Sequence, residues 1–128
     1  MIKVYVSSSC GSCRKAMEWL QKHRIEFEAV NLSKTSVLRE DLIKILRVSE
    51  NGLSDIISTR SHSYHTIKSK LEDLHLDEAL DLIEKDNSLL KRPILFDERH
   101  FQVGFNSEEI RQFIPAQVRK MEIKMEKI

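Results

Sequence analysis

The chain contains few of the residues that cross-link or interrupt a backbone: its 128 residues include two cysteines, two prolines and three glycines. Two cysteines are too few for a scaffold held together by disulfides. No run approaches the roughly 20 apolar residues that a transmembrane helix needs, so we expect no membrane association. Met1–Val6 is too short for the apolar part of a secretory signal, which favours a cytoplasmic location. Because that compartment keeps thiols reduced, we expect a cysteine pair there to have a role other than a permanent structural disulfide.

The sequence also lacks a dominant charge. Lysine and arginine number 21 and aspartate and glutamate 20, which gives a formal net charge of +1. Strong DNA binding depends on basic residues that neutralise phosphates, so we expect this chain to contact DNA only weakly. A role in transcription would therefore go through a protein partner. Hydrophobic residues make up 41% of the chain, enough for one modest core.

The first 32 residues have the pattern of a strand, a helix and a second strand. Ile2–Val6 is a β-rich apolar run. Between residues 11 and 23 the apolar side chains fall on one face of a helix. These side chains are Cys13, Ala16, Met17 and Leu20. Residues 26–32 again have the composition of a strand. A right-handed crossover through the helix predicts that the two strands run parallel.

The middle of the chain has helical periodicity. Over residues 38–46 an apolar stripe predicts a helix, and Asn51-Gly52 predicts its end. The stripe consists of Leu38, Leu42, Ile43, Ile45 and Leu46. A short segment follows, and residues 61–70 predict a marginal, largely polar helix. Asp77 resembles the N-cap of one more helix, with Leu76 as a hydrophobic staple.

The pattern then returns to strands. Ile94–Phe96 and His100–Val103 predict a hairpin, because each is short and apolar and a polar turn lies between them. Asn106–Glu109 resembles a capping box that starts a last helix, and Pro115 predicts its end.

The order of these elements predicts an α/β fold, a thioredoxin-like mixed sheet (βαβ…ββα) with a central all-α insertion. We expect residues 1–115 to form a single domain. In it, residues 1–32 and 88–115 would form the redox core, and residues 36–87 the helical insertion. Residues 116–128 would form a tail with helical spacing, which either rests on the body or orders on a partner or protease.

The stretch SSSCGSCRKA, residues 7–16, carries the chemistry. After a strand, Cys10 would lie at the entrance of the helix and Cys13 one turn inside it. Backbone N–H groups without partners and the positive end of the helix dipole favour a thiolate at Cys10, and Arg14 and Lys15 add positive potential. We therefore expect Cys10 to be the nucleophile and Cys13 the resolving thiol, with oxidation closing a disulfide between them. The alternative is that Cys13 only fills the buried stripe of the helix.

Two arginines are candidates for facing the thiols. Arg92-Pro93 precedes the predicted third strand, where a thioredoxin-like layout usually has a cis proline beside the cysteine pair, so we predict a cis Arg92–Pro93 bond. Arg60 and Arg92 would converge on Cys10, where they would hold an anion or stabilise a thiolate. The alternative is that both arginines form ordinary surface ion pairs.

Gly52 and the histidines each allow two interpretations. Gly52 is either a helix C-cap that needs a positive φ or a place where a partner comes close to the backbone. His62 and His65 are three residues apart and could share a helix face. Zinc would need four well-spaced ligands, which the cysteines and histidines do not supply clearly, so we expect neither a metal nor another cofactor.

Four stretches, in this order along the chain, resemble the Spx family of thiol-sensing transcriptional regulators, in the arsenate-reductase-like branch of the thioredoxin superfamily. Together they touch nearly the whole chain, and the middle and late ones are more specific than the cysteine motif. They are SCGSCRKAMEWL, ILRVSENGLSDIISTRS, LLKRPILFDE and QVGFNSEEIRQFIP.

The resemblance implies a regulator that binds the C-terminal domain of the RNA polymerase α subunit, rather than reading promoter DNA alone. Gly52 matches the family's contact region for the α subunit, with Arg47 and Glu50 beside it. The resemblance also implies control by a Clp-type protease and its adaptor through the C-terminal tail. Here the ending KMEKI departs from the small, apolar ending typical of the family.

The same resemblance implies that Cys10 and Cys13 form a disulfide under oxidative stress, and that Arg60, Arg92 and Pro93 belong to the switch. The CGSC centre keeps both thiols. It lacks the proline of many general disulfide oxidoreductases, which disfavours a function of that kind. The main alternative is a thiol-dependent arsenate-reductase-like enzyme, with Cys10 as nucleophile and the two arginines holding the oxyanion. We favour the regulator, which is not an enzyme.

Overall fold

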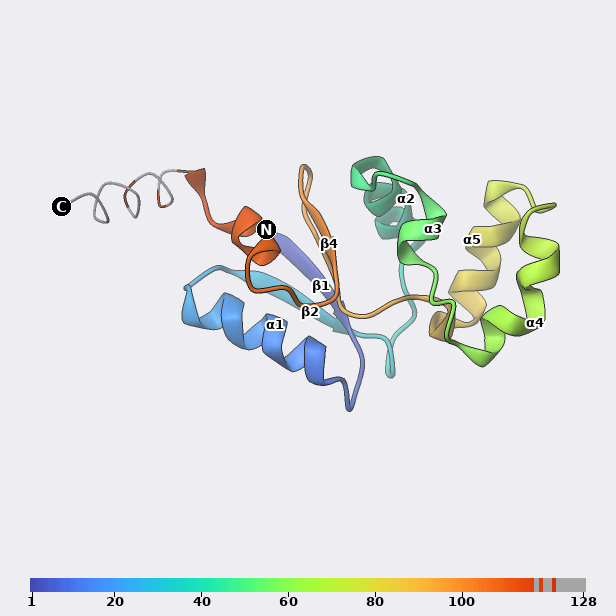
Figure 1. The fold of residues 1–128 in the computed structure, drawn as a ribbon, viewed down its shortest axis with the longest axis horizontal. Coiled ribbons are helices and arrows are strands. Elements are labelled where there is room, and N and C mark those ends of the chain that lie inside the picture. The colour runs from blue at the N-terminus through green and yellow to red at the C-terminus, as the bar shows by residue number, and fades with distance from the viewer. Residues whose placement is uncertain (117, 119–120, 122–128) are drawn as a thin grey trace.

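The computed structural model describes residues 1–116, 118 and 121 (Figure 1). Its strands are β1 (Ile2–Val6), β2 (Phe27–Asn31), β3 (Ile94–Phe96) and β4 (Phe101–Val103). Its α-helices are α1 (Gly11–Lys22), α2 (Arg39–Val48), α3 (Leu53–Ile56), α4 (His62–Leu71) and α5 (Leu76–Lys85). Two 3-10 helices are η1 (Asn87–Leu89) and η2 (Glu109–Phe113).

The four strands form one mixed sheet in the order β2-β1-β3-β4. β1 runs parallel to β2 and antiparallel to β3, and β3 runs antiparallel to β4. The parallel pair joined by α1 and the later hairpin confirm the predicted thioredoxin-like layout. α2 to α5 lie together beyond one end of the sheet in Figure 1, as expected for a helical insertion.

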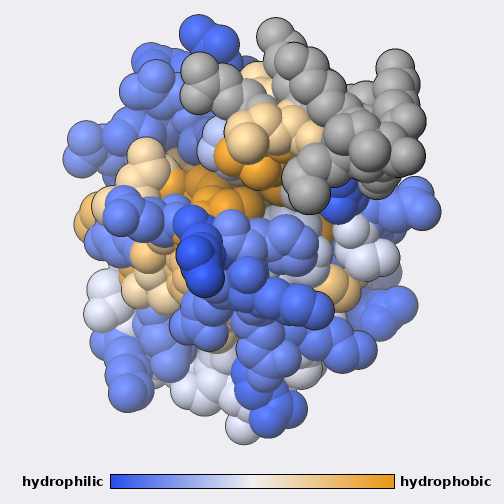
Figure 2. All heavy atoms as spheres, turned by 90° about the vertical axis from the view of Figure 1, so that its left-hand side faces the viewer, coloured by the Kyte–Doolittle hydropathy of each residue, from blue (hydrophilic) through white to orange (hydrophobic). Residues whose placement is uncertain are grey.

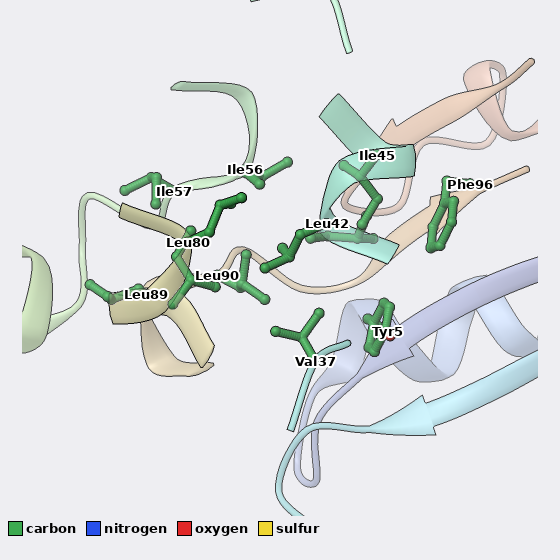
Figure 3. Close-up of a cluster of buried hydrophobic side chains, with 12 residues drawn as sticks. Tyr5, Val37, Leu42, Ile45, Ile56, Ile57, Leu80, Leu89, Leu90 and Phe96 are labelled. Carbon is green, nitrogen blue, oxygen red and sulfur yellow. The ribbon is translucent and has the colours of Figure 1, made fainter. Parts of the chain in front are cut away.

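Alternation along β1 separates two apolar clusters, because successive side chains of a strand point to opposite faces. Ile2, Val4 and Val6 pack against α1 and η2. Tyr5 points the other way and joins a cluster that continues into the insertion. Figure 3 shows this cluster passing from Tyr5 and Phe96 of the sheet to the side chains of the insertion. The insertion and the sheet therefore share one apolar cluster.

The structure corrects three details of the helical region. α2 ends at Val48, before Asn51-Gly52, because the backbone turns extended at Ser49. Leu38 and Ile43 of the predicted stripe are 51% and 40% exposed, so the buried face of α2 is narrower than predicted.

The third correction concerns the start of α5. The N-cap is His75 and not Asp77, and Leu76 is the first helical residue rather than a staple. The Glu78 side chain accepts a hydrogen bond from the His75 backbone N–H at 3.2 Å. The helix can therefore begin two residues earlier than an aspartate cap would allow, since this glutamate satisfies one of its free N–H groups.

The last predicted helix is the 3-10 helix η2. The Asn106 side chain accepts hydrogen bonds from the N–H groups of Glu108 and Glu109, which form the turn before the helix. The N-cap of η2 is Glu108, which makes no side-chain cap hydrogen bond, so the predicted capping box is wrong. Of the predicted tail, Met125 and Ile128 lie outside the described residues. Val118 and Met121 are exposed apolar side chains. On the face of the molecule shown in Figure 2, hydrophobic residues are visible among mostly hydrophilic ones.

Within the described part of the chain, no helix has the length and apolar character needed to cross a membrane. The division of the chain into a redox core and an insertion at residues 32–36 and 87–88 stays a prediction.

Leu20→Ala tests the packing of α1 on the sheet. Leu20 is fully buried in the cluster between α1 and β1. Removing its side chain leaves a cavity, and we expect the free energy of unfolding to fall by about 2–5 kcal/mol. Urea denaturation measures the loss, and the exposed Lys22→Ala on the same helix should change it by less than about 0.5 kcal/mol. Equal effects of the two substitutions would contradict this packing.

Candidate functional site

The loop after β1 places Cys10 as the N-cap of α1. Ser9 has a φ of 60°, a left-handed conformation that is uncommon for a residue with a side chain, and the chain is extended at Cys10. The Cys10 Sγ atom accepts a hydrogen bond from the backbone N–H of Cys13 at 3.2 Å. A sulfur atom thus occupies the position that a serine or aspartate oxygen fills at most helix starts.

Cys13 is buried and Cys10 is half-buried, and both are free thiols. Burial, and then a hydrogen bond with the Cys10 side chain, raise the pKa of the Cys13 thiol from 9.0 to about 12. The backbone of Ser7 and the positive charge of Arg92 act in the opposite direction on this pKa. Cys13 is therefore protonated at neutral pH, and the more accessible thiol, Cys10, is the one that can react first.

An open pocket of about 740 Å³ lies over Cys10. Its lining comes from four segments that are distant in sequence: the loop after β1, the segment after α3, the segment before β3 and the end of β4. The residues are Ser7, Ser8, Ser9, Cys10, Ser58, Thr59, Arg60, Leu90, Lys91, Arg92 and Val103. The lining holds three cations, several hydroxyls and one thiol, and it includes no carboxylate.

The structure brings Arg60 and Arg92 into the lining of this same pocket. The Arg92–Pro93 bond is cis, as predicted. Among the described residues, neither arginine has a carboxylate within ion-pair distance, which disfavours the alternative of surface ion pairs. Their roles stay predictions, but unneutralised guanidinium groups beside a thiol suit the binding of an anion.

Sequence reasoning missed Lys91 and the hydroxyls of Ser58 and Thr59. Ser58 and Thr59 lie just after α3, and Lys91 lies just after η1. The two segments pair there through a bridge between Ile57 and Leu90. The Ser58 N–H donates to the Leu89 carbonyl at 2.7 Å, and the Lys91 N–H donates to the Ile56 carbonyl at 2.8 Å. The adjacent Lys91 and Arg92 could have indicated a cationic wall, but no local pattern shows that it faces the serines after β1.

Arg47, Glu50 and Gly52 lie outside this pocket, at the end of α2 and the start of α3. Arg47 and Glu50 are exposed. Gly52 has φ 66° and ψ −135° and precedes α3, so the predicted positive φ is confirmed, but the residue is not a C-cap of α2. No atom lies within 4 Å of the place where a Cβ would be. The glycine is therefore required here by backbone conformation and is open to a partner.

A second hollow, of about 780 Å³, lies between α2 and the first half of β1, and Arg47 is in its wall. It is slightly larger than the thiol pocket but contains neither cysteine. Its lining mixes acids and bases, with Lys3 and Asp41 already paired to each other. This composition favours a solvated surface over a reaction site.

Among residues 1–116, 118 and 121, no group of three or more His, Cys, Asp and Glu side chains could hold a metal ion. His62 and His65 are both exposed on α4.

Alkylation rates test the assignment of the two thiols. At pH 7.5 a pKa of about 12 leaves on the order of 10⁻⁴ to 10⁻⁵ of Cys13 as thiolate, and the side chain is 1% exposed. We expect iodoacetamide to modify Cys10 at least 100-fold faster than Cys13 in the folded protein, as followed by peptide mass spectrometry. In 8 M urea the two rates should become similar. Comparable rates in the folded protein would contradict the assignment.

Comparisons with known proteins agree with this geometry. Residues 5–113 match the model of the ArsC family. The chain is 43% identical over 124 residues to the global transcriptional regulator Spx of Streptococcus mutans, covering 97% of this chain and 90% of that protein. It is 45% identical to the protein of the same name from Streptococcus pneumoniae, covering 97% of this chain and 93% of that protein.

Solved structures agree on the fold. A possible arsenate reductase from Streptococcus mutans superposes with a TM-score of 0.70 at 32% identity, covering 84% of this chain and 92% of that chain. An arsenate reductase from Vibrio cholerae gives a TM-score of 0.70 at 16% identity, covering 88% of this chain and 94% of that chain, and supports the fold alone. With the thiol motif at the start of α1 and a match along nearly its whole length, the chain belongs to the Spx regulators of the ArsC family.

Proposed function

We propose that this protein is a redox-sensing global regulator of transcription. It binds the C-terminal domain of the RNA polymerase α subunit, and a Cys10–Cys13 disulfide formed under thiol-oxidative stress switches it. Relatives at 43–45% identity are named as global transcriptional regulators. The observation that carries the redox part is the sulfur N-cap: Cys10 Sγ accepts from the N–H of Cys13, so the two residues of the disulfide are already in contact.

Closing the disulfide would change the wall of the thiol pocket. Bonded to Cys13, the Cys10 sulfur can no longer form a thiolate in the pocket that Arg92 lines. Arg92 follows Lys91, whose N–H is bonded to Ile56 at the end of α3, and Gly52 is the N-cap of that helix. A movement of Arg92 could therefore move α3 through these backbone hydrogen bonds. It would thereby move the proposed docking residues Arg47, Glu50 and Gly52.

The proposal also covers DNA, location and proteolysis. DNA is contacted weakly and within the polymerase complex, because the net charge is only +1. The protein works in the cytoplasm. Control by a Clp-type protease and adaptor concerns the C-terminal residues, most of which lie outside the described residues.

Binding to purified α C-terminal domain tests the proposal directly. We expect the oxidised protein to bind with at least a 5-fold different Kd from the reduced protein, measured by calorimetry in dithiothreitol and after treatment with diamide. The Cys13→Ala variant should give one Kd under both conditions. Failure of the wild-type protein to bind in either redox state would contradict the proposal.

Gly52→Arg tests the docking surface. Any side chain at this φ and ψ costs about 1–3 kcal/mol of backbone strain, so Gly52→Ala is the matched control for strain. We expect Gly52→Arg to weaken binding of the α domain at least 10-fold more than Gly52→Ala does, because only the longer side chain blocks the partner. Both variants should still form the disulfide. Equal binding by the two variants would remove Gly52 from the interface.

A second function, thiol-dependent arsenate reduction, is favoured by one observation: the cation-lined pocket over Cys10 contains no carboxylate. An oxyanion could be held there by Arg60 and Arg92 while Cys10 attacks it. Arsenate turnover coupled to a thiol reductant would support this activity. Disulfide formation without turnover would dismiss it.

A further inference from the structure

Asp41 is a buried carboxylate that the thiol chemistry does not use. It lies in the first turn of α2 and is 4% exposed. A buried charge is costly unless it is paired and hydrogen-bonded. The partners of Asp41 therefore show how α2 is held against the rest of the fold.

Among the described residues, the side-chain partners of Asp41 both come from β1. The Tyr5 hydroxyl donates a hydrogen bond to Asp41 Oδ2, and Lys3 Nζ lies 2.6 Å from the same oxygen. The Tyr5 oxygen in turn accepts from the N–H of Leu38, the residue that precedes α2, at 3.4 Å. We call the contact among Lys3, Tyr5 and Asp41 the strand–helix tie.

The strand side of the tie is fixed. Tyr5 is fully buried, and its ring stacks on Phe96 of β3 with centroids 6.2 Å apart and an interplanar angle of 4° (Figure 3). Burial, followed by the hydrogen bond to Asp41, raises the pKa of Tyr5 above its ordinary value, so the hydroxyl stays protonated and donates. β1 itself is paired on both edges, with β2 and with β3.

The helix side of the tie carries the proposed docking surface. Asp41 and Arg47 are six residues apart on α2, and Glu50 and Gly52 follow. The other polar anchor of α2 is Arg39, which pairs with Asp81 and Glu84 of α5 but is itself 33% exposed, so water screens those pairs. Leu42 and Ile45 of α2 pack in the apolar cluster, but apolar contacts do not fix the orientation of a helix as hydrogen bonds do. Among the described residues, the strand–helix tie is thus a buried, directional contact between α2 and the sheet.

We infer that Tyr5 and Asp41, with Lys3, are positioning residues for the polymerase-docking surface. This inference rests on the proposed function. Without the Tyr5 hydroxyl, α2 keeps its apolar packing but loses its fixed placement on the sheet. The partner then meets Arg47, Glu50 and Gly52 in a distribution of positions, and its affinity falls.

Tyr5→Phe tests the inference, because it removes one hydroxyl and keeps the ring. Two readouts are needed: amide hydrogen exchange of residues 42–48, and the Kd for the α C-terminal domain. We expect exchange in α2 to accelerate at least 10-fold while α1 changes less than 2-fold, and Kd to rise at least 3-fold. Alkylation of Cys10 should be unchanged.

Phe113→Leu is the matched control. Phe113 is buried in the cluster on the other face of the sheet and does not touch α2. The substitution should lower the stability of the protein without affecting the strand–helix tie. We therefore expect the amides of α2 to exchange no faster than those of α1, and the Kd for the α C-terminal domain to stay within 2-fold of the wild-type value. Asp41→Asn, which keeps an oxygen acceptor for Tyr5, should lie between the wild type and Tyr5→Phe in both readouts.

The possible failures can be told apart. Binding by the wild type, together with unchanged α2 exchange and unchanged Kd in Tyr5→Phe, would overturn the inference and leave the proposed function intact. Equal acceleration in α1 and α2 would also overturn it, because the tie would then be an ordinary contribution to stability. No binding by the wild type would contradict the proposed function, whereas the exchange data would still decide whether the tie fixes α2.

Discussion

The placement of strand β1 is the constraint on which both candidate sites depend. β1 is paired with β2 and β3 on its two edges and packed on both faces. Its end leads within four residues to Cys10, and from its middle Tyr5 and Lys3 hold the carboxylate of α2. A strand held on both edges and both faces therefore positions the thiol loop and the proposed docking helix relative to the same sheet.

The chemistry at the end of that strand follows from a sulfur in a capping position. Cys10 satisfies an N–H group of α1 that would otherwise lack a partner, and it faces three cations across an open pocket. Cys13, one turn deeper, is protected by burial. In the proposed switch, oxidation would replace this hydrogen bond at the start of α1 with a covalent bond, in a pocket lined by three cations.

Much of the fold could be predicted from the sequence because it is encoded locally. The apolar run Ile2–Val6 and the helical spacing after Cys10 predicted the βαβ unit, and the place of the proline in that layout predicted its cis bond. The predicted start of α5 is two residues too late. Glu78 accepts a hydrogen bond from the His75 N–H, so the helix begins before Asp77, the predicted N-cap. The strand–helix tie and the role of Lys91 in the pocket were missed. Both depend on residues brought together from distant parts of the chain, and no spacing rule relates residue 3 to residue 41.

In the proposed switch, the disulfide alters the distant docking surface through the wall of the thiol pocket. The most direct measurement is a comparison of backbone amide chemical shifts in reduced and oxidised protein. We predict changes that extend from residues 7–14 through Lys91 and Arg92 to residues 47–60, with the shifts of β2 unchanged. Changes confined to residues 7–14, with residues 47–60 at their reduced positions, would contradict the claim.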